Sequence, residues 1–169
     1  MRISRADMFL RVAEIIAERG TCPRAQVGAV IVRDGRIISM GYNGAPKGLP
    51  HCEDVGCVIG TNGGCERAVH AEMNAVMWAA REGISTDMAT MYCTYSPCVY
   101  CAVAIVACGI QAFCYLHNYR DDAGLKILND HLVMTRKWSI GAGSVADTEG
   151  AKSHAASRDR GSHHDGGGI

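Results

Sequence analysis

The stretch CERAVHAEMNAVMWAAREG, residues 65–83, decides the fold of this chain together with the shorter stretch SPCVYC, residues 96–101. Within the longer stretch, alanine and other apolar residues recur with the period of an amphipathic helix. Gly83 follows the last of them, and glycine is favoured just beyond a helix C-terminus. The sequence therefore predicts a helix that begins close to His70 and ends at Gly83.

The shorter stretch carries the signals of a second helix start. Ser96 is a favoured N-cap residue, and proline is favoured at the first helical position, which Pro97 would occupy. This pattern predicts that Cys98 lies in the first turn, where a helix N-terminus favours a thiolate. Residues three apart share a face of a helix, so Cys98 and Cys101 are expected to reach the same ion.

One imidazole and two thiolates form an established ligand set for catalytic zinc, which keeps its fourth position open for water. His70, Cys98 and Cys101 supply these groups. Glu72 follows His70 at the mouth of the first helix, where a carboxylate is placed for proton transfer. His-x-Glu followed by Pro-Cys-x-x-Cys is the signature of zinc deaminases, in which the Glu is not a ligand. The motif therefore predicts a catalytic zinc on three residues, with Glu72 as general acid and base.

Each of these residues has a simpler interpretation when it is taken alone. A CxxC pair can be a redox pair, a histidine can be part of the core, and a helical glutamate can be solvated. A zinc-stabilised interaction module without catalysis is the alternative from another class. A structural site closes its fourth position with a protein ligand, whereas this motif offers three ligands and the carboxylate of Glu72. The complete signature therefore favours catalysis.

Length and composition predict one soluble domain. The 169 residues can bury a substantial core, and they show neither a signal-peptide pattern nor an apolar run that could cross a membrane. Without such a signal, the nine cysteines are expected to be thiols or metal ligands in a cytoplasmic protein. Seventeen basic and seventeen acidic residues give a net charge of zero, which counts against a nucleic-acid partner.

Composition also divides the chain. From Ser139 onward it consists mainly of Gly, Ser, Ala and charged residues, which cannot bury enough apolar surface to order themselves. We therefore expect a catalytic domain over residues 1–138 and a flexible tail over 139–169. The tail contains three histidines that we expect to be solvated: His154, His163 and His164.

Hydrophobic patterns and turn residues divide the domain into helices and strands. Ser4 and Asp7 form a capping box at the start of a helix that runs to Gly20. Asp34-Gly35 is a two-residue turn of a β-hairpin. The expected strands cover residues 27–32, 36–42, 89–94, 111–116 and 131–135, and a further helix covers 121–129. A hairpin followed by alternating strands and helices predicts an α/β fold, a three-layer α/β/α sandwich with a mixed five-stranded sheet.

The segment from Asn43 to Gly64 is long for a loop without periodicity inside a compact domain, and such loops usually have a function. Four cysteines lie in it or beside it and could hold a structural zinc: Cys22, Cys52, Cys57 and Cys65. His51 is an alternative fourth ligand. Three further cysteines lie in apolar strand or helix contexts and are expected to be small buried residues: Cys93, Cys108 and Cys114.

Four other short segments carry a family resemblance. They are residues 21–24 (TCPR), 26–30 (QVGAV), 41–44 (GYNG) and 48–52 (GLPHC). With these and the two zinc motifs, the chain from Ser4 to about Lys137 resembles the deoxycytidylate deaminases, a branch of the cytidine deaminase-like superfamily. The resemblance implies the cytidine deaminase-like fold and hydrolysis of dCMP to dUMP and ammonia. An alternative is another cytosine or adenine deaminase of the superfamily, acting on a nucleoside or a nucleic-acid base.

The same resemblance implies partners and substrate contacts. It implies a homo-oligomer, a hexamer, that is activated by dCTP and inhibited by dTTP, with Mg²⁺ accompanying the triphosphate. It assigns the deoxyribose hydroxyl to Asn43 and the 5′-phosphate to Arg24 and Tyr119. It assigns the pyrimidine edge to the backbone of Ala71.

Overall fold

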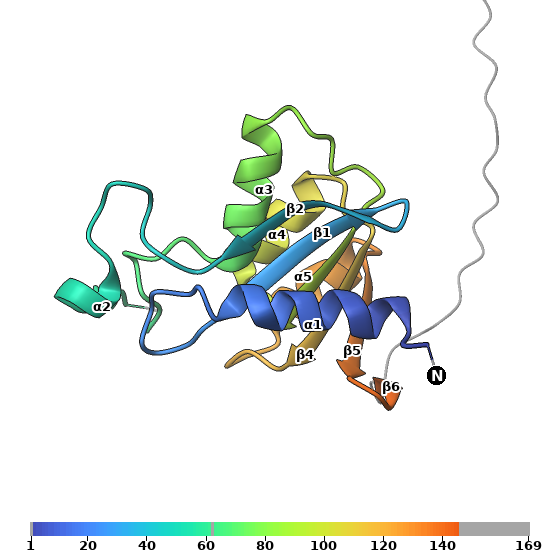
Figure 1. Cartoon of the computed structure of the whole chain (residues 1–169). Helices are drawn as coiled ribbons and strands as arrows, with labels where there is room; N and C mark the ends of the chain where they lie inside the picture. The colour runs from blue at the N-terminus through green and yellow to red at the C-terminus, as the bar shows by residue number, and fades with distance from the viewer. Residues whose placement is uncertain (1, 62, 146–169) are drawn as a thin grey trace, which may run out of the picture.

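The computed structural model describes residues 2–61 and 63–145. The helices are α1 (Arg5–Ala17), α2 (Cys52–Val55), α3 (Ala71–Arg81), α4 (Val99–Ala107) and α5 (Ala123–Asp130). The strands are β1 (Gly28–Arg33), β2 (Arg36–Tyr42), β3 (Thr90–Tyr95), β4 (Ala112–His117), β5 (Met134–Ser139) and β6 (Gly143–Val145). Figure 1 shows their arrangement: α1 lies across one face of the sheet, and α3, α4 and α5 lie on the other. The predicted three-layer sandwich is confirmed.

The sheet is mixed, with its strands in the order β2-β1-β3-β4-β5-β6. β1 is antiparallel to β2 and to β3, whereas β3, β4 and β5 run parallel, because α4 and α5 connect them. All five expected strands are present. β6 is an addition, and it pairs antiparallel with β5 at the edge of the sheet. It was not predicted because its residues lie in the stretch whose composition indicates a tail.

The start of the expected tail therefore needs correction. Residues 139–145 finish β5 and form β6, so the sheet extends beyond the expected boundary at residue 138. Backbone pairing between Lys137 and Val145 and between Ser139 and Gly143 orders this ribbon, although it has few large apolar side chains. The rest of the expected tail, with His154, His163 and His164, lies outside the described residues.

The hairpin between β1 and β2 follows its turn residues. Asp34 and Gly35 have φ values of 52° and 74°, the left-handed conformation that a type I′ turn requires at both positions. β1 is buried along its whole length except at Arg33. This strand is inside the sheet, between β2 and β3, which explains its continuous apolar run.

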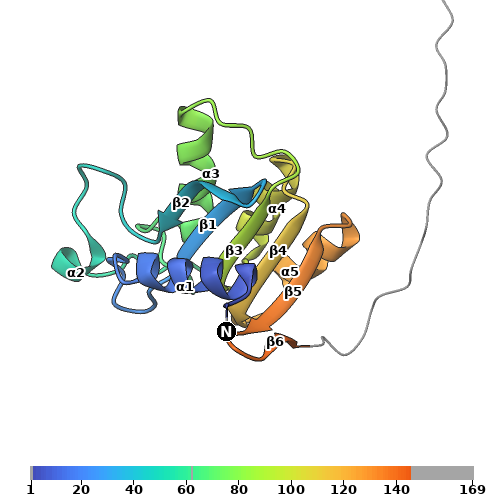
Figure 2. The same ribbon diagram turned by 45° about the vertical axis from the view of Figure 1, so that its right-hand side comes forward.

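Helix α1 is capped as predicted and is tied to the β5–β6 ribbon at the edge of the sheet. Ser4 Oγ accepts a hydrogen bond of 3.0 Å from the backbone N–H of Asp7. The Asp7 carboxylate accepts bonds from Trp138 Nε1 at 2.8 Å and from the backbone N–H of Gly141 at 3.2 Å. Figure 2 shows the start of α1 close to β6. The Trp138 indole, followed by the Gly141 N–H, lowers the pKa of Asp7 below its usual value.

The larger core lies between the sheet and helices α3 to α5. It is built from buried apolar residues of β1, β3 and β4 and of the helices that cover them. Phe113 and Ile105 are fully buried there. Truncating such a side chain to alanine costs about 2–5 kcal/mol. This packing fixes the ends of α3 and α4 relative to the sheet.

Several predicted boundaries are shifted by a few residues, and two of these shifts have a clear local reason. Helix α4 begins at Val99 with Cys98 as its N-cap, not at Pro97, because Ser96 Oγ accepts the backbone N–H of Tyr119 at 2.7 Å and does not cap the helix. The last parallel strand begins at Met134, not at residue 131. Leu132 takes a left-handed φ of 60°, which ends α5 and turns the chain before the strand.

Helix α2, which the sequence pattern did not predict, is a single turn within the cysteine-bearing loop. Among the described residues, no helix combines the length and the apolar character needed to cross a membrane.

Candidate active site

The three predicted zinc ligands come together at the N-termini of α3 and α4. His70 is the N-cap of α3, Cys98 is the N-cap of α4, and Cys101 lies in the first turn of α4. His70 Nδ1 lies 3.4 Å from Cys98 Sγ and 3.4 Å from Cys101 Sγ. The three donor atoms all lie within 4.8 Å of one another, and one imidazole with two thiols suits zinc. The residues therefore fit a single zinc ion with an open fourth position.

The local electrostatics favour a thiolate at the mouth of α4. The hydrogen bond from Cys101, followed by that from His70, lowers the pKa of the Cys98 thiol to about 4. The same pair interaction raises the pKa of Cys101, with burial adding to it, and the contact with Cys98 raises the pKa of His70. Cys98 is thus the first of the two thiols to ionise, as its place at a helix N-terminus predicts.

Glu72 lies beside these ligands, in the first turn of α3. Its side chain is only 4% exposed, and burial raises the pKa of the carboxyl to about 7. A carboxyl that titrates near neutral pH can both accept and donate a proton under ordinary conditions. The geometry therefore gives Glu72 the properties of a general acid and base.

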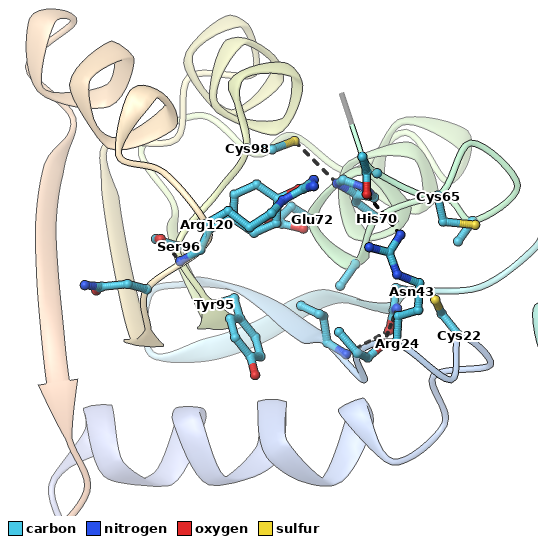
Figure 3. Close-up of a pocket in the computed structure, with 18 residues that line it drawn as sticks. Cys22, Arg24, Asn43, Cys65, His70, Glu72, Tyr95, Ser96, Cys98 and Arg120 are labelled. Carbon is cyan, nitrogen blue, oxygen red and sulfur yellow. Dashed lines mark hydrogen bonds between the residues drawn. The ribbon is translucent and has the colours of Figure 1, made fainter. Parts of the chain in front are cut away.

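A cavity of about 450 Å³ opens over His70, Glu72 and Cys98. Figure 3 shows these side chains together on one side of it, with Arg24 and Arg120 reaching in from opposite sides. Its wall contains all four residues to which the resemblance assigned substrate contacts: Arg24, Asn43, Ala71 and Tyr119.

Two of these residues are held in place by the fold. Asn43 is buried, donates to the carbonyl of Ala25 at 2.7 Å, and accepts the backbone N–H of Val27 at 2.8 Å. This arrangement fixes the amide at the wall of the cavity. The Arg24 guanidinium donates to the carbonyl of Gly63 at 3.0 Å.

Several residues of the wall were not predicted from the sequence, above all Arg120. Its guanidinium lies 4.8 Å from the centre of the Tyr119 ring and donates to the Tyr119 hydroxyl. The available signal was position: Asn118, Tyr119 and Arg120 directly follow β4, and the carboxyl ends of parallel strands are where such sheets bind ligands. Two guanidiniums at one cavity make that part of it suitable for an anion.

The other four cysteines also come together. Cys52 Sγ lies 3.5 Å from Cys65 Sγ, and Cys22 Sγ lies 3.8 Å from Cys57 Sγ. All four sulfurs are within 4.8 Å of one another, as the ligands of a structural Cys₄ zinc would be. The alternative ligand His51 is not part of this group, because its Nδ1 lies 3.0 Å from Thr21 Oγ1.

Of the remaining cysteines, Cys93 and Cys114 are buried, as predicted. Cys108 is half-buried and packs against the larger core. Neither metal-ligand group in the described part of the chain includes them.

A three-residue zinc site with a buried carboxyl beside it is the arrangement of hydrolytic zinc enzymes. The profile of the cytidine and deoxycytidylate deaminase zinc-binding region matches residues 3–117. The chain therefore belongs to the cytidine and deoxycytidylate deaminase family.

Individual relatives agree with this assignment. ComE operon protein 2 of Bacillus subtilis is 43% identical over 119 residues, which cover 70% of this chain and 62% of that protein. Deoxycytidylate deaminase of Mycobacterium phage D29 is 40% identical over 119 residues, which cover 64% of this chain and 91% of that protein. The chain spans only 46% and 40% of the deoxycytidylate deaminases of Saccharomyces cerevisiae and Schizosaccharomyces pombe.

A solved structure shares the fold. The crystal structure of dCMP deaminase from the cyanophage S-TIM5 in complex with dCMP and dUMP has a TM-score of 0.72 and 29% sequence identity. The match covers 81% of this chain and 98% of that chain.

Proposed function

We propose that this protein is a zinc-dependent deoxycytidylate deaminase that converts dCMP and water to dUMP and ammonia. One observation carries the proposal: a single cavity has the zinc ligands His70 and Cys98 and the carboxyl of Glu72 in its wall, together with the guanidiniums of Arg24 and Arg120. The first group suits hydrolytic attack on a base, and the second suits a phosphate. The cyanophage dCMP deaminase, whose structure was solved in complex with dCMP and dUMP, supports this choice of substrate.

In the proposed reaction, His70, Cys98 and Cys101 would hold a zinc ion, which would supply Lewis acidity toward water. Glu72 accepts a proton from the water that attacks C4 of cytosine and delivers a proton to N3. It then takes the second proton of that water from the hydroxyl at C4 and passes it to the departing amine. The C4–N bond breaks, ammonia leaves, and the ring of dUMP remains. The burial that brings the pKa of Glu72 to about 7 suits it to both transfers.

The rest of the substrate is assigned to the other wall residues. Asn43 binds the deoxyribose hydroxyl, and the backbone of Ala71 binds the pyrimidine edge. Arg24 and Tyr119 bind the 5′-phosphate, and Arg120 joins them because its guanidinium lies over the Tyr119 ring. Charge-assisted contacts of this kind favour the monophosphate over the free nucleoside.

The test compares kcat/KM for dCMP, deoxycytidine, CMP and a short single-stranded DNA, with and without dCTP. We expect dCMP to be preferred, and Arg24→Ala to narrow the gap between dCMP and deoxycytidine. Loss of the phosphate should lower turnover as well as binding, because remote contacts position the base. Better use of deoxycytidine or the oligonucleotide under both conditions would exclude the deoxycytidylate assignment and leave zinc-dependent deamination intact.

We also propose a homo-oligomer, a hexamer, in which dCTP activates and dTTP inhibits, each with Mg²⁺. Exposed apolar side chains on α4 support self-association: Tyr100 is 73% exposed and Val103 is 54% exposed. The family resemblance supports the effectors. A cytoplasmic location suits a protein whose cysteines serve as thiols and metal ligands. Light scattering with and without each nucleotide measures the assembly directly.

A further inference from the structure

The second group of cysteines is connected to the substrate cavity. Cys22 and Cys65 belong to the four-sulfur group and also line the cavity, whereas Cys52 and Cys57 do not line it. The sulfur group therefore lies directly behind one part of the cavity wall. Figure 3 shows Cys22 and Cys65 on the same side of the cavity as Arg24.

The side-chain hydrogen bond of Arg24 connects two chain segments that each carry a cysteine of this group. Arg24 follows Cys22 by two residues, and it donates to the carbonyl of Gly63, which precedes Cys65 by two residues. The bond of 3.0 Å thus links two chain segments, each of which is held by its own cysteine. Arg24 is exposed, so this acceptor restricts a side chain that would otherwise move freely.

The guanidinium of Arg120 also lies against the backbone at Gly63. A Cβ on Gly63 would lie only 2.8 Å from Arg120 Nη1, and Gly63 has a φ of +72°, which favours glycine. Gly63 and Gly64 are both part of the cavity wall. The wall between the two guanidiniums is therefore a stretch of backbone that ends at Cys65.

We propose that the metal centre formed by Cys22, Cys52, Cys57 and Cys65 determines selectivity for the 5′-phosphate by positioning Arg24 and the Gly63 backbone. The four residues act through Arg24 and Arg120 and do not contact the reacting base. This inference rests on the proposed function, because it assumes that the two guanidiniums bind the phosphate. Metal binding at such a site is coupled to local folding, so its loss releases both segments.

The test removes the second metal without substituting any residue of the cavity wall. The variant Cys52→Ser/Cys57→Ser loses two ligands outside the wall, and Cys108→Ser is the control for loss of a cysteine elsewhere. Zinc per chain is measured by elemental analysis, and calorimetry measures the affinities for dUMP and deoxyuridine. We expect two zinc ions per chain in the wild type and the control, and one in the double variant. The preference for dUMP over deoxyuridine should fall by about tenfold or more in the double variant only.

Two further variants keep the inference testable if the double variant folds poorly. Gly63→Ala keeps every cysteine but crowds Arg120, and it should also weaken dUMP more than deoxyuridine. In the Arg24→Ala background, Cys52→Ser/Cys57→Ser should lower the preference for dUMP over deoxyuridine by a smaller factor than in the wild type. Both changes act on one contact, so their effects should not add.

The possible results separate the two proposals. A double variant that has lost one zinc and keeps the wild-type preference overturns the inference, as does an equal loss of affinity for both ligands. One zinc per chain in the wild type also overturns it. A wild type that binds dUMP no better than deoxyuridine contradicts the proposed function itself.

Discussion

Glu72 is the residue on which the proposed chemistry depends most directly. It is buried beside the zinc ligands but is not one of them. Its substitution should therefore separate catalysis from metal binding, which substitution of His70 or Cys98 cannot do.

We predict that Glu72→Gln keeps its zinc and loses activity. The amide has nearly the same shape, but it cannot accept and return protons, and general acid–base groups contribute on the order of 10² to 10⁴ in rate. Elemental analysis and kcat for dCMP measure the two effects. Glu82→Gln, an exposed change just beyond the end of the same helix, is the control. Activity of Glu72→Gln within tenfold of the wild type would rule out this role.

At the scale of single residues, the sequence was informative where a motif fixes spacing and silent where a contact depends on the fold. His70, Glu72, Cys98 and Cys101 follow from spacing alone, and the structure brings them together. Arg120 could not be predicted in this way, because nothing in the sequence shows that it stacks on Tyr119 at the cavity. His51 was a plausible ligand by type, but its ring faces Thr21.

Helix α5 bears on the metal site through its first turn. A Cβ on Gly124 would lie 2.0 Å from the carbonyl oxygen of Pro97 and 3.0 Å from the carbonyl carbon of Cys98. Only glycine allows α5 to approach the chain so closely at this point. The helix therefore supports the backbone that carries a zinc ligand.

We predict that Gly124→Ala weakens zinc binding at the catalytic site. The added methyl group must displace Pro97 and Cys98, and loss of such support lowers metal affinity by about 10- to 100-fold. Overpacking also costs about 1–3 kcal/mol in stability. A chelator competition measures the affinity, and urea unfolding measures the stability.

Gly28→Ala is the matched control for this change. Its Cβ would also lie 2.0 Å from a carbonyl oxygen, that of Ala13, but on α1 and away from the zinc ligands. It should lose stability and keep its zinc affinity. If both variants hold zinc equally well, Gly124 has no positioning role.

Most elements could be predicted because their apolar periods and turn residues are local. Helix α3 and the β1–β2 hairpin are clear examples, since a terminal glycine and an Asp-Gly turn mark their ends. The start of α4 was misplaced because Ser96 is bonded to Tyr119, a residue 23 positions away. β6 could not be predicted because it is ordered by pairing with β5 and not by its composition.

At the scale of the whole molecule, Asp7 joins the first helix to the last ribbon of the sheet. The ordinary pKa of its carboxyl is 3.8, and the Trp138 indole and the Gly141 N–H lower it. A lowered pKa means that the folded state favours the charged carboxylate. The stabilisation is therefore complete above about pH 4 and is lost as the pH falls through the folded pKa, below 3.8.

We predict that Asp7→Asn lowers the melting temperature at pH 7, and that its difference from the wild type shrinks below about pH 4. Thermal unfolding between pH 7 and pH 3 measures both. Glu14→Gln removes an exposed carboxylate from the same helix and controls for the change in net charge. Metal release in acid affects all three proteins alike, so the quantity to compare is the difference in melting temperature between each variant and the wild type. A difference that stays constant down to pH 3 would contradict the prediction.

The contact between Asp7 and Trp138 also orders events during synthesis, because it spans 131 positions of the chain. A ribosome that adds about 5–20 residues per second needs roughly 7–26 seconds to pass from one residue to the other. Throughout that interval α1 can form and bind the sheet, but its first turn lacks these two hydrogen bonds. Helix α1 therefore gains its last two hydrogen bonds only after the ribbon of β5 and β6 has left the exit tunnel.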